Sequence, residues 1–297
     1  MARLVYLGTP DAAVAPLRTL VKAGHDVALV VTRPDRRRGR GSALVPSPVK
    51  AAALECGLAV TDDLLDATAV GAELGVMVAY GRIVTVAVLE QLPMVNLHFS
   101  LLPRWRGAAP VERALLEGDS ETGVCLMAVE AGLDTGPIYA QSATPIGDEQ
   151  TVDELRSRLV GIGCALLDEH LARGRAGLPV PRDQAGTPSY AEKILPHELE
   201  LDWERSALHL RRVVRLGRAW TTFRGRRVRV LSAAPTGDPP DPEVGRLTPG
   251  ALRGARVGAG GGTAIRLVTV QPEGGRPMEA TAWLNGLRAF PEERLGT

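Results

Sequence analysis

The sequence has few cysteines, no long apolar run and no visible signal peptide. Its three cysteines, Cys56, Cys125 and Cys164, are widely spaced and form no CxxC pair, which argues against a disulfide framework. The apolar runs at 4–7 and 27–31 are far shorter than the roughly 18 residues that suggest a membrane span. These absences predict a protein of the reducing cytoplasm that does not enter a membrane.

Several familiar site motifs are missing as well. The five histidines are scattered and form no zinc-binding pattern with the cysteines. The turn after the first apolar run has the sequence GTPD at 8–11 instead of GxGxxG, so the dinucleotide-binding fingerprint is absent. Ser100 lacks the GxSxG surroundings of a hydrolase nucleophile. Zinc, dinucleotide and serine-hydrolase chemistry are therefore not expected.

What is present predicts a folded chain of two domains. The chain has 297 residues, of which 45% are hydrophobic and 23% charged, and domains average about 100–200 residues. Apolar runs at 3–7 and 27–31 flank a helical pattern at 12–23, which gives a βαβ unit. The alternation predicts an α/β domain with a Rossmann-like, doubly wound parallel sheet. Its further strands are expected at 75–80, 94–98 and 122–129, and its further helices at 48–56, 84–91 and 151–173.

The remainder of the chain differs in amino-acid composition and in the length of its apolar runs. Gly and Pro crowd the segment at 176–196, which predicts a linker across the face of the first domain. One helix at 203–217 then precedes short β-rich runs, a pattern typical of a small β-barrel. The predicted organisation is an N-terminal domain at 1–175, the linker at 176–196 and a C-terminal domain at 197–297.

The net charge of +1 hides two basic segments. Residues 33–50 carry six cationic side chains and one carboxylate, and residues 201–230 carry nine arginines and two carboxylates. Along the predicted helix in the second segment, Arg211, Arg215 and Arg218 recur at i, i+4 and i+7, a stripe suited to phosphate contacts. Charge alone leaves RNA binding and a solvated arginine-rich surface equally open.

Asn96, His98 and Asp134 form the constellation best suited to catalysis. Asn96 and His98 stand two residues apart at the end of a predicted strand, so their side chains point to one face. Asp134 lies between glycines in a loop after another strand, where its carboxylate would orient His98 and fix its tautomer. Such a set suits attack of an amine on a carbonyl, with an amide N–H for the oxyanion and an imidazole base. A structural histidine and an Asx turn at Asp134 are the alternatives.

Longer motifs around these residues resemble a known family. NLHFSLLPRWRGAAP at 96–110 and GLDTG at 132–136 are similar to the signature of the 10-formyltetrahydrofolate-dependent formyltransferases. Phe99 departs from it, because many members have glycine there, and its ring bears on the shape of the folate pocket. Further motifs occur in the same order as in the members that act on methionyl initiator tRNA: GTPD at 8–11, PDRRRGRG at 34–41, PSPVK at 46–50, VAYGRI at 78–83 and YAEKI at 190–194.

The resemblance implies a reaction and a set of site residues. The formyl group of 10-formyltetrahydrofolate, a co-substrate, would pass to the α-amino group of methionine on initiator tRNA, with no metal and in a monomer. Asn96, His98 and Asp134 match the catalytic residues of the family. The stretch that lines the folate site matches Ser100, Leu101, Leu102 and Pro103, although core packing also explains the two leucines.

The resemblance also gives the basic segments a role in binding tRNA. The loop at 33–45 matches the family's contact with the acceptor end of the tRNA, and the C-terminal domain resembles an OB-type fold. Three alternatives stay open: a sugar-nucleotide N-formyltransferase, a formyltetrahydrofolate hydrolase, and a non-catalytic RNA-binding relative. The residues expected to bind tRNA are Arg36, Arg37, Arg38, Arg40, Arg211, Arg215 and Arg218.

Overall fold

The computed structural model describes residues 1–37, 44–236, 247–291 and 293–297. Arg38 and Arg40, both predicted to bind tRNA, lie outside the described residues. The chain divides into two compact units, and the segments of the second unit at 112–119 and 147–154 come from within the predicted N-terminal domain. The first unit comprises Met1–Val111, Ser120–Ile146 and Leu155–Glu192, and the second comprises Glu112–Asp119, Gly147–Glu154 and Lys193–Thr297.

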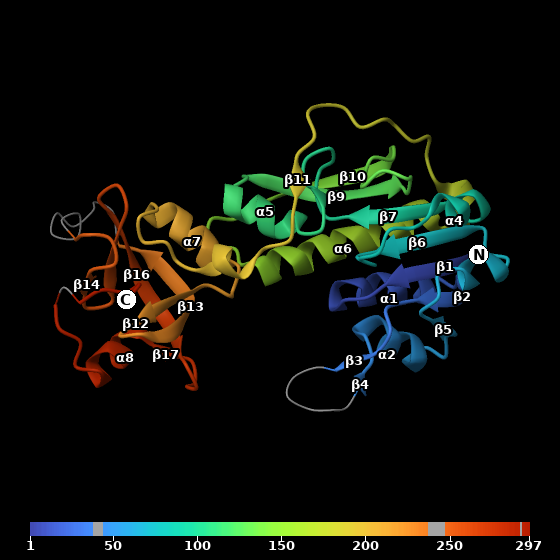
Figure 1. The fold of residues 1–297 in the computed structure, drawn as a ribbon. Coiled ribbons are helices and arrows are strands. Elements are labelled where there is room, and N and C mark those ends of the chain that lie inside the picture. The colour runs from blue at the N-terminus through green and yellow to red at the C-terminus, as the bar shows by residue number, and fades with distance from the viewer. Residues whose placement is uncertain (38–43, 237–246, 292) are drawn as a thin grey trace. The chain divides into compact units, whose positions relative to one another are not determined.

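A seven-stranded sheet forms the centre of the first unit (Figure 1). Its strands, in spatial order, are β10 (Ile138–Pro145), β9 (Glu121–Ala128), β7 (Met94–His98), β6 (Leu74–Val78), β1 (Arg3–Gly8), β2 (Asp26–Val31) and β5 (Val60–Thr61). The five strands from β7 to β5 run parallel, whereas β9 is antiparallel to β7 and β10 is antiparallel to β9. The predicted α/β class is confirmed, with a mixed sheet in place of a wholly parallel one.

Helices accompany the sheet because its strands alternate apolar side chains between two faces. On one face, Val5 and Leu7 share a buried cluster with Val88 of α4. On the other face, Leu97 lies against Gly163 of α6, whose first turn has the predicted capping box between Thr151 and Glu154. The helices of the first unit are α1 (Val14–Lys22), α2 (Pro48–Glu55), α3 (Asp66–Ala69), α4 (Val86–Gln91) and α6 (Val152–Leu171), of which the first three residues belong to the second unit. Helix α5 (Pro110–Glu117) belongs to the second unit from Glu112 on.

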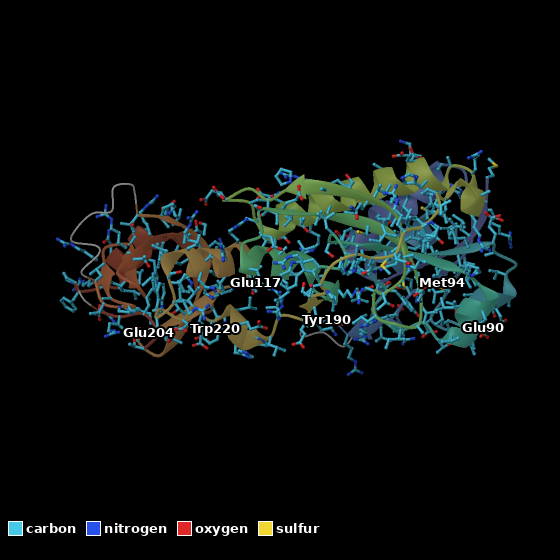
Figure 2. All side chains as sticks on the ribbon, turned by 90° about the horizontal axis from the view of Figure 1, so that it is seen from above. Glu90, Met94, Glu117, Tyr190, Glu204 and Trp220 are labelled. Atoms are coloured by element: carbon cyan, nitrogen blue, oxygen red, sulfur yellow. The ribbon has the colours of Figure 1, made fainter. Side chains whose placement is uncertain are left out.

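Residues 182–191, which we call the strap, run along the first unit and are hydrogen-bonded to it. Arg182 exchanges two backbone hydrogen bonds of 2.8 Å with Ile138. Strand β11 (Tyr190–Ala191) pairs in parallel with β8 (Arg106–Gly107), and Tyr190 is labelled in Figure 2. The strap lies within the segment predicted as a linker, and its backbone pairing makes it part of the first unit. The exact domain borders at 175 and 197 stay a prediction.

The second unit contains an antiparallel sheet, as expected for its class. The strand order is β12 (Trp220–Phe223), β13 (Arg226–Pro235), β16 (Thr263–Pro272), β15 (Arg256–Ala259) and β14 (Leu252–Arg253), with β17 (Met278–Glu279) also on β16. Helix α7 (Ala207–Arg215) begins after Ser206, whose hydroxyl accepts from the His209 amide. Helix α8 (Ala280–Gly286) was not anticipated from the sequence. The likeness to an OB-type barrel stays a prediction.

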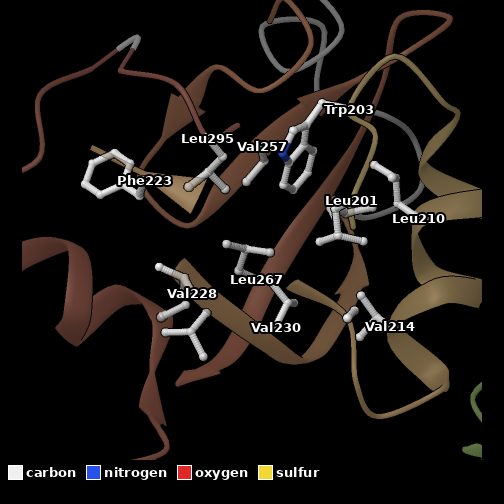
Figure 3. Close-up of a cluster of buried hydrophobic side chains, with 14 of the residues drawn as sticks. Leu201, Trp203, Leu210, Val214, Phe223, Val228, Val230, Val257, Leu267 and Leu295 are labelled. Carbon is white, nitrogen blue, oxygen red and sulfur yellow. The ribbon is translucent and has the colours of Figure 1, made fainter. Parts of the chain in front are cut away.

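A cluster of apolar side chains holds the second unit together (Figure 3). Val228 and Val230 alternate inward along β13, and Leu210 and Val214 face them from α7. The ring of Trp203 is also buried, and its indole N–H donates to the Thr221 hydroxyl at 3.0 Å. Across the described residues of both units, no helix is long and apolar enough to cross a membrane.

The cluster makes Leu267→Ala a test of the second unit's stability. Leu267 is 2% exposed, so its truncation leaves a cavity and lowers the free energy of unfolding by about 2–5 kcal/mol. Leu208→Ala is the matched control, because Leu208 on α7 is 56% exposed. Urea unfolding followed by circular dichroism measures both. An equal loss in the two variants would contradict the assignment of Leu267 to the core.

Candidate active site

Asn96, His98 and Asp134 lie together in the first unit, as the sequence analysis expected. Asn96 and His98 point from β7 to one face and are both nearly buried. The Asn96 Nδ2 atom is 3.5 Å from one carboxylate oxygen of Asp134, and the His98 Nδ1 atom is 3.6 Å from the other. One carboxylate therefore faces both the amide and the imidazole.

The course of the chain that brings Asp134 to Asn96 and His98 was not predicted from the sequence. Because β9 runs antiparallel to β7, its end at Ala128 pairs with Val95, near the beginning of β7. The loop between β9 and β10 must therefore turn back over the sheet to bring Asp134 to Asn96 and His98. Asp134 lies in a loop after a strand, as predicted, but the sheet was predicted to be parallel, and that prediction is wrong for β9.

Two local features support this turned-back loop. Asp134 has a φ of +50°, in the left-handed region where an aspartate is tolerated better than most residues. Gly136 approaches the backbone so closely that a Cβ there would lie 2.1 Å from the Ala128 carbonyl oxygen. The carboxylate itself is anchored, because the Gly107 amide donates to its Oδ2 atom at 2.8 Å. The GLDTG motif thus combines the carboxylate that faces Asn96 and His98 with a glycine that the turn requires.

The orientation of His98 is set by a backbone group. Its Nε2 atom lies 2.8 Å from the carbonyl oxygen of Trp105. Because a carbonyl only accepts, Nε2 carries the hydrogen, and the lone pair of the neutral ring is on Nδ1, which faces Asp134. Trp105 therefore fixes the tautomer, a task that the sequence interpretation assigned to Asp134. This contact could not be predicted from the sequence, because every residue carries a backbone carbonyl.

The turn that presents this carbonyl is itself held by the strap. Trp105 has a φ of +63°, which is uncommon for a bulky residue. Its amide donates to the Ser189 hydroxyl at 2.9 Å, and the Ser189 amide donates to the Pro103 carbonyl at 3.2 Å. The guanidinium of Arg104 lies 4.5 Å from the centre of the Trp105 ring. Strap contacts therefore support a backbone conformation that orients the imidazole.

The predicted folate segment follows directly after His98. Ser100 is fully buried, and its hydroxyl donates to the Arg104 carbonyl at 2.6 Å, so it acts in the turn. Leu102 packs in a small buried cluster with Cys125 and Met127, and Leu101 lies against Gly123. Phe99 is buried, and a cis peptide bond precedes Pro103. The folate role of Ser100, Leu101, Leu102 and Pro103 stays a prediction.

Those arginines predicted to bind tRNA that lie in the described part of the chain fall into two groups. Arg36 and Arg37 are exposed on β3 (Arg36–Arg37), which pairs with β4 (Leu44–Val45). Arg218 is exposed as well, just after α7. Arg211 instead pairs with Glu149, and Arg215 donates to the carbonyls of 147 and 150 at 2.7 Å each. Burial lowers the pKa of Arg215 from its ordinary value. Arg211 and Arg215 therefore bond to groups of their own unit, and contact of the arginine stripe with tRNA stays a prediction.

The three cysteines are free thiols, and Cys125 lies directly beside β7. Cys125 on β9 pairs in register with His98, and its sulfur accepts a hydrogen bond from the Leu102 amide at 3.4 Å. Burial raises the pKa of Cys125 to about 11. In the described part of the chain, no group of three or more His, Cys, Asp or Glu side chains is placed to hold a metal ion.

Comparison with known proteins decides the family. The sequence pattern of the formyl transferase family matches residues 2–170, and that of the formyl transferase C-terminal domain matches residues 193–288. The chain belongs to the formyl transferase family. The first match covers Asn96, His98 and Asp134, so the resemblance inferred from their motifs is confirmed.

Curated relatives of this formyl transferase match it over nearly its whole length. It is 41% identical over 302 residues to a protein of Dechloromonas aromatica named methionyl-tRNA formyltransferase, covering 96% of this chain and 95% of that one. It is also 41% identical over 314 residues to the methionyl-tRNA formyltransferase of Methylococcus capsulatus, covering 99% of this chain and all of the other. Both units therefore have counterparts in these relatives.

Solved structures share the fold at lower identity. An N-formyltransferase from Helicobacter canadensis, in complex with folinic acid and dTDP-3-aminofucose, has a TM-score of 0.70 at 18% identity and covers 90% of this chain. The structure of methionyl-tRNA formyltransferase from Clostridium thermocellum has a TM-score of 0.58 at 17% identity and covers 79% of this chain and 93% of that one. At these identities the likeness establishes the fold of this formyl transferase and leaves its acceptor open.

The thiol beside His98 gives a test of the site's packing. Below pH 9, Cys125 should resist alkylation by iodoacetamide in the native protein, because its pKa of about 11 keeps it protonated and its side chain is buried. Cys56, which is partly exposed, provides the internal reference. Peptide mass spectrometry measures both, and unfolding in urea should make the two equally reactive. Labelling of native Cys125 as rapid as that of Cys56 would show that the strand is open.

Proposed function

We propose that this formyl transferase moves the formyl group of 10-formyltetrahydrofolate to the α-amino group of methionine on initiator tRNA. The observation that carries the proposal is the 41% identity to methionyl-tRNA formyltransferases across both units. The product, N-formylmethionyl-tRNA, serves to initiate translation. A cytoplasmic location and a monomeric state stay predictions that are compatible with this role.

The site residues suit attack of a neutral amine on a formyl carbon. 10-Formyltetrahydrofolate supplies that carbon as the electrophile. The donor set fits it, because Asn96 places an amide beside a buried imidazole and carries two N–H groups, one toward Asp134 and one for the formyl oxygen. As negative charge develops on that oxygen, Asn96 stabilises it.

His98 and Asp134 handle the proton that the amine releases. The Trp105 carbonyl occupies the Nε2 side of the imidazole, so Nδ1 accepts the proton. The Asp134 carboxylate, 3.6 Å from Nδ1, stabilises the imidazolium that results. His98 then returns the proton to the departing nitrogen. Because α-amino groups have pKa values near 7.7–8.0 in general, a useful fraction of the acceptor is neutral at pH 7.

The surface charge favours RNA over a small sugar as the acceptor. Arg36 and Arg37 extend from the first unit, and Arg226, Arg227 and Arg229 are exposed on β13 of the second. Such arginines contact phosphates without reading sequence. A sugar-nucleotide N-formyltransferase or a formyltetrahydrofolate hydrolase gives Arg36 and Arg37 no phosphate backbone to contact. Arg227 and Arg229 also have contacts within their own unit, with the Trp220 ring and with the Gly217 carbonyl. A non-catalytic RNA-binding relative leaves the convergence of Asn96, His98 and Asp134 unexplained.

The direct test is formylation by the purified protein. It is incubated with 10-formyltetrahydrofolate and either methionyl initiator tRNA or a nucleotide-linked amino sugar, and formyl transfer to each amine is measured. We expect formylmethionyl-tRNA and no formylated sugar. Transfer to the sugar alone would overturn the proposed acceptor, and release of formate with neither acceptor modified would indicate a hydrolase.

Substitution of the three site residues should slow formyl transfer without weakening the binding of tRNA. In Asn96→Ala, loss of an oxyanion donor lowers kcat by roughly 10²–10³-fold, and we expect losses of similar order in His98→Ala and Asp134→Ala. The Kd for tRNA, measured by filter binding, should change less than about twofold, since these side chains act on the formyl group and its proton. Equal losses in kcat and in tRNA affinity would contradict the assigned roles.

Substitution of arginines in the loop at 33–45 should have the opposite effect. Arg37→Ala and Arg40→Ala should raise the KM for tRNA and leave the KM for folate unchanged, because each removes a predicted phosphate contact. The slope of log Kd against log salt should also fall, since fewer counterions are released. Arg175→Ala is the matched control, because Arg175 is exposed outside the basic segments. Unchanged tRNA use in both variants would refute the role of the loop.

A further inference from the structure

Gln184 in the strap joins two elements that hold Asp134. Its Oε1 atom accepts from Arg106 of β8, at 2.7 Å from one guanidinium nitrogen and 3.1 Å from Nε. Its Nε2 atom donates to the Asp134 carbonyl at 2.8 Å and to the Gly136 carbonyl at 2.9 Å. The side chain thus makes four hydrogen bonds, two of them to the loop that carries the catalytic carboxylate.

We propose that Gln184 is a positioning residue for formyl transfer, which acts by fixing the backbone of the catalytic loop at Asp134 and Gly136. The inference rests on the proposed function, in which Asp134 stabilises the imidazolium of His98. Neither the motifs nor the family match single out Gln184, because its partners are backbone carbonyls and an arginine of a distant segment. Tertiary contacts alone assign it this role.

The chemistry of the contact requires a primary amide. The Arg106 guanidinium only donates, whereas the carbonyls of Asp134 and Gly136 only accept. A group between them must therefore both accept and donate, and the glutamine amide does so with its oxygen and its NH₂. A glutamate retains the acceptor for Arg106 and turns an oxygen toward the two carbonyls in place of a donor.

The position of Asp134 depends on β8 through two connections. The Gly107 amide holds the carboxylate directly, and Arg106, the preceding residue, holds Gln184. Asp134 is in the left-handed region, so its backbone benefits from the external hydrogen bond that Gln184 supplies. With that bond lost, the loop can relax and carry the carboxylate away from the His98 Nδ1 atom.

The strap also supports the other group that orients His98. Ser189, five residues after Gln184 in the chain, accepts a hydrogen bond from the Trp105 amide. The carbonyl of Trp105 and the carboxylate of Asp134 face the two nitrogens of His98. One strap thus contacts the supports of both imidazole nitrogens, and one of those supports, the Asp134 carboxylate, also faces the Asn96 amide.

The first test compares Gln184→Glu and Gln184→Leu with wild type in steady-state formylation. We expect kcat to fall roughly 10- to 100-fold, as for small displacements of catalytic groups, while the KM for each substrate changes less than about twofold. Thr187→Ala, at an exposed position of the same strap, is the control and should match wild type. Thermal melting checks the fold of each variant, and Gln184→Glu preserves side-chain length and the bond to Arg106. Wild-type kcat in folded Gln184→Glu would overturn the proposal.

The second test separates a positioning role from a merely structural one. In an Asp134→Ala background, Gln184→Glu should lower the single-turnover rate constant of formyl transfer by less than about twofold further, because the carboxylate that Gln184 positions is gone. A full additional loss in that background would overturn the proposal. Failure of the proposed function can be distinguished from failure of the Gln184 proposal, because the wild-type protein would then be inactive on methionyl-tRNA. The same variants would then be measured with the amine that wild type does formylate.

Discussion

The site depends on one carboxylate held against two partners at once. Asp134 faces the Asn96 amide and the His98 imidazole, and the Gly107 amide keeps it there. This geometry is possible only because the loop after β9 turns back over the sheet, which in turn requires the antiparallel hairpin of β9 and β10 at one edge. The departure from a wholly parallel sheet therefore brings Asp134 to Asn96 and His98.

Backbone groups do much of the orienting work in this protein. The Trp105 carbonyl selects the tautomer of His98, and the Gly107 amide anchors Asp134. Such groups position side chains with little conformational freedom, because they belong to turns that the fold already holds. The strap contributes through Gln184 and Ser189, so a segment rich in Gly and Pro acts as a structural support of the site.

The distribution of arginines shows why charge along a sequence does not map directly onto a binding surface. Both basic segments are real, yet Arg211 and Arg215 bond to a carboxylate and to carbonyls within their own unit. Arg36, Arg37 and Arg218 remain exposed to solvent. A helical stripe of arginines has the same spacing in either role, and only the segments packed against it distinguish them.

The sequence by itself determined the α/β class, most strands and helices of the first unit, the β-rich character of the second unit and the resemblance to the family. Hydrophobic alternation and turn residues are local signals, and the motifs around Asn96, His98 and Asp134 are dense enough to be specific. It did not reveal the direction of β9, the helix α8, the tautomer of His98 or the role of Gln184. Those features arise from pairings between distant segments and from backbone amides and carbonyls, which every residue carries and which tertiary structure alone brings into contact.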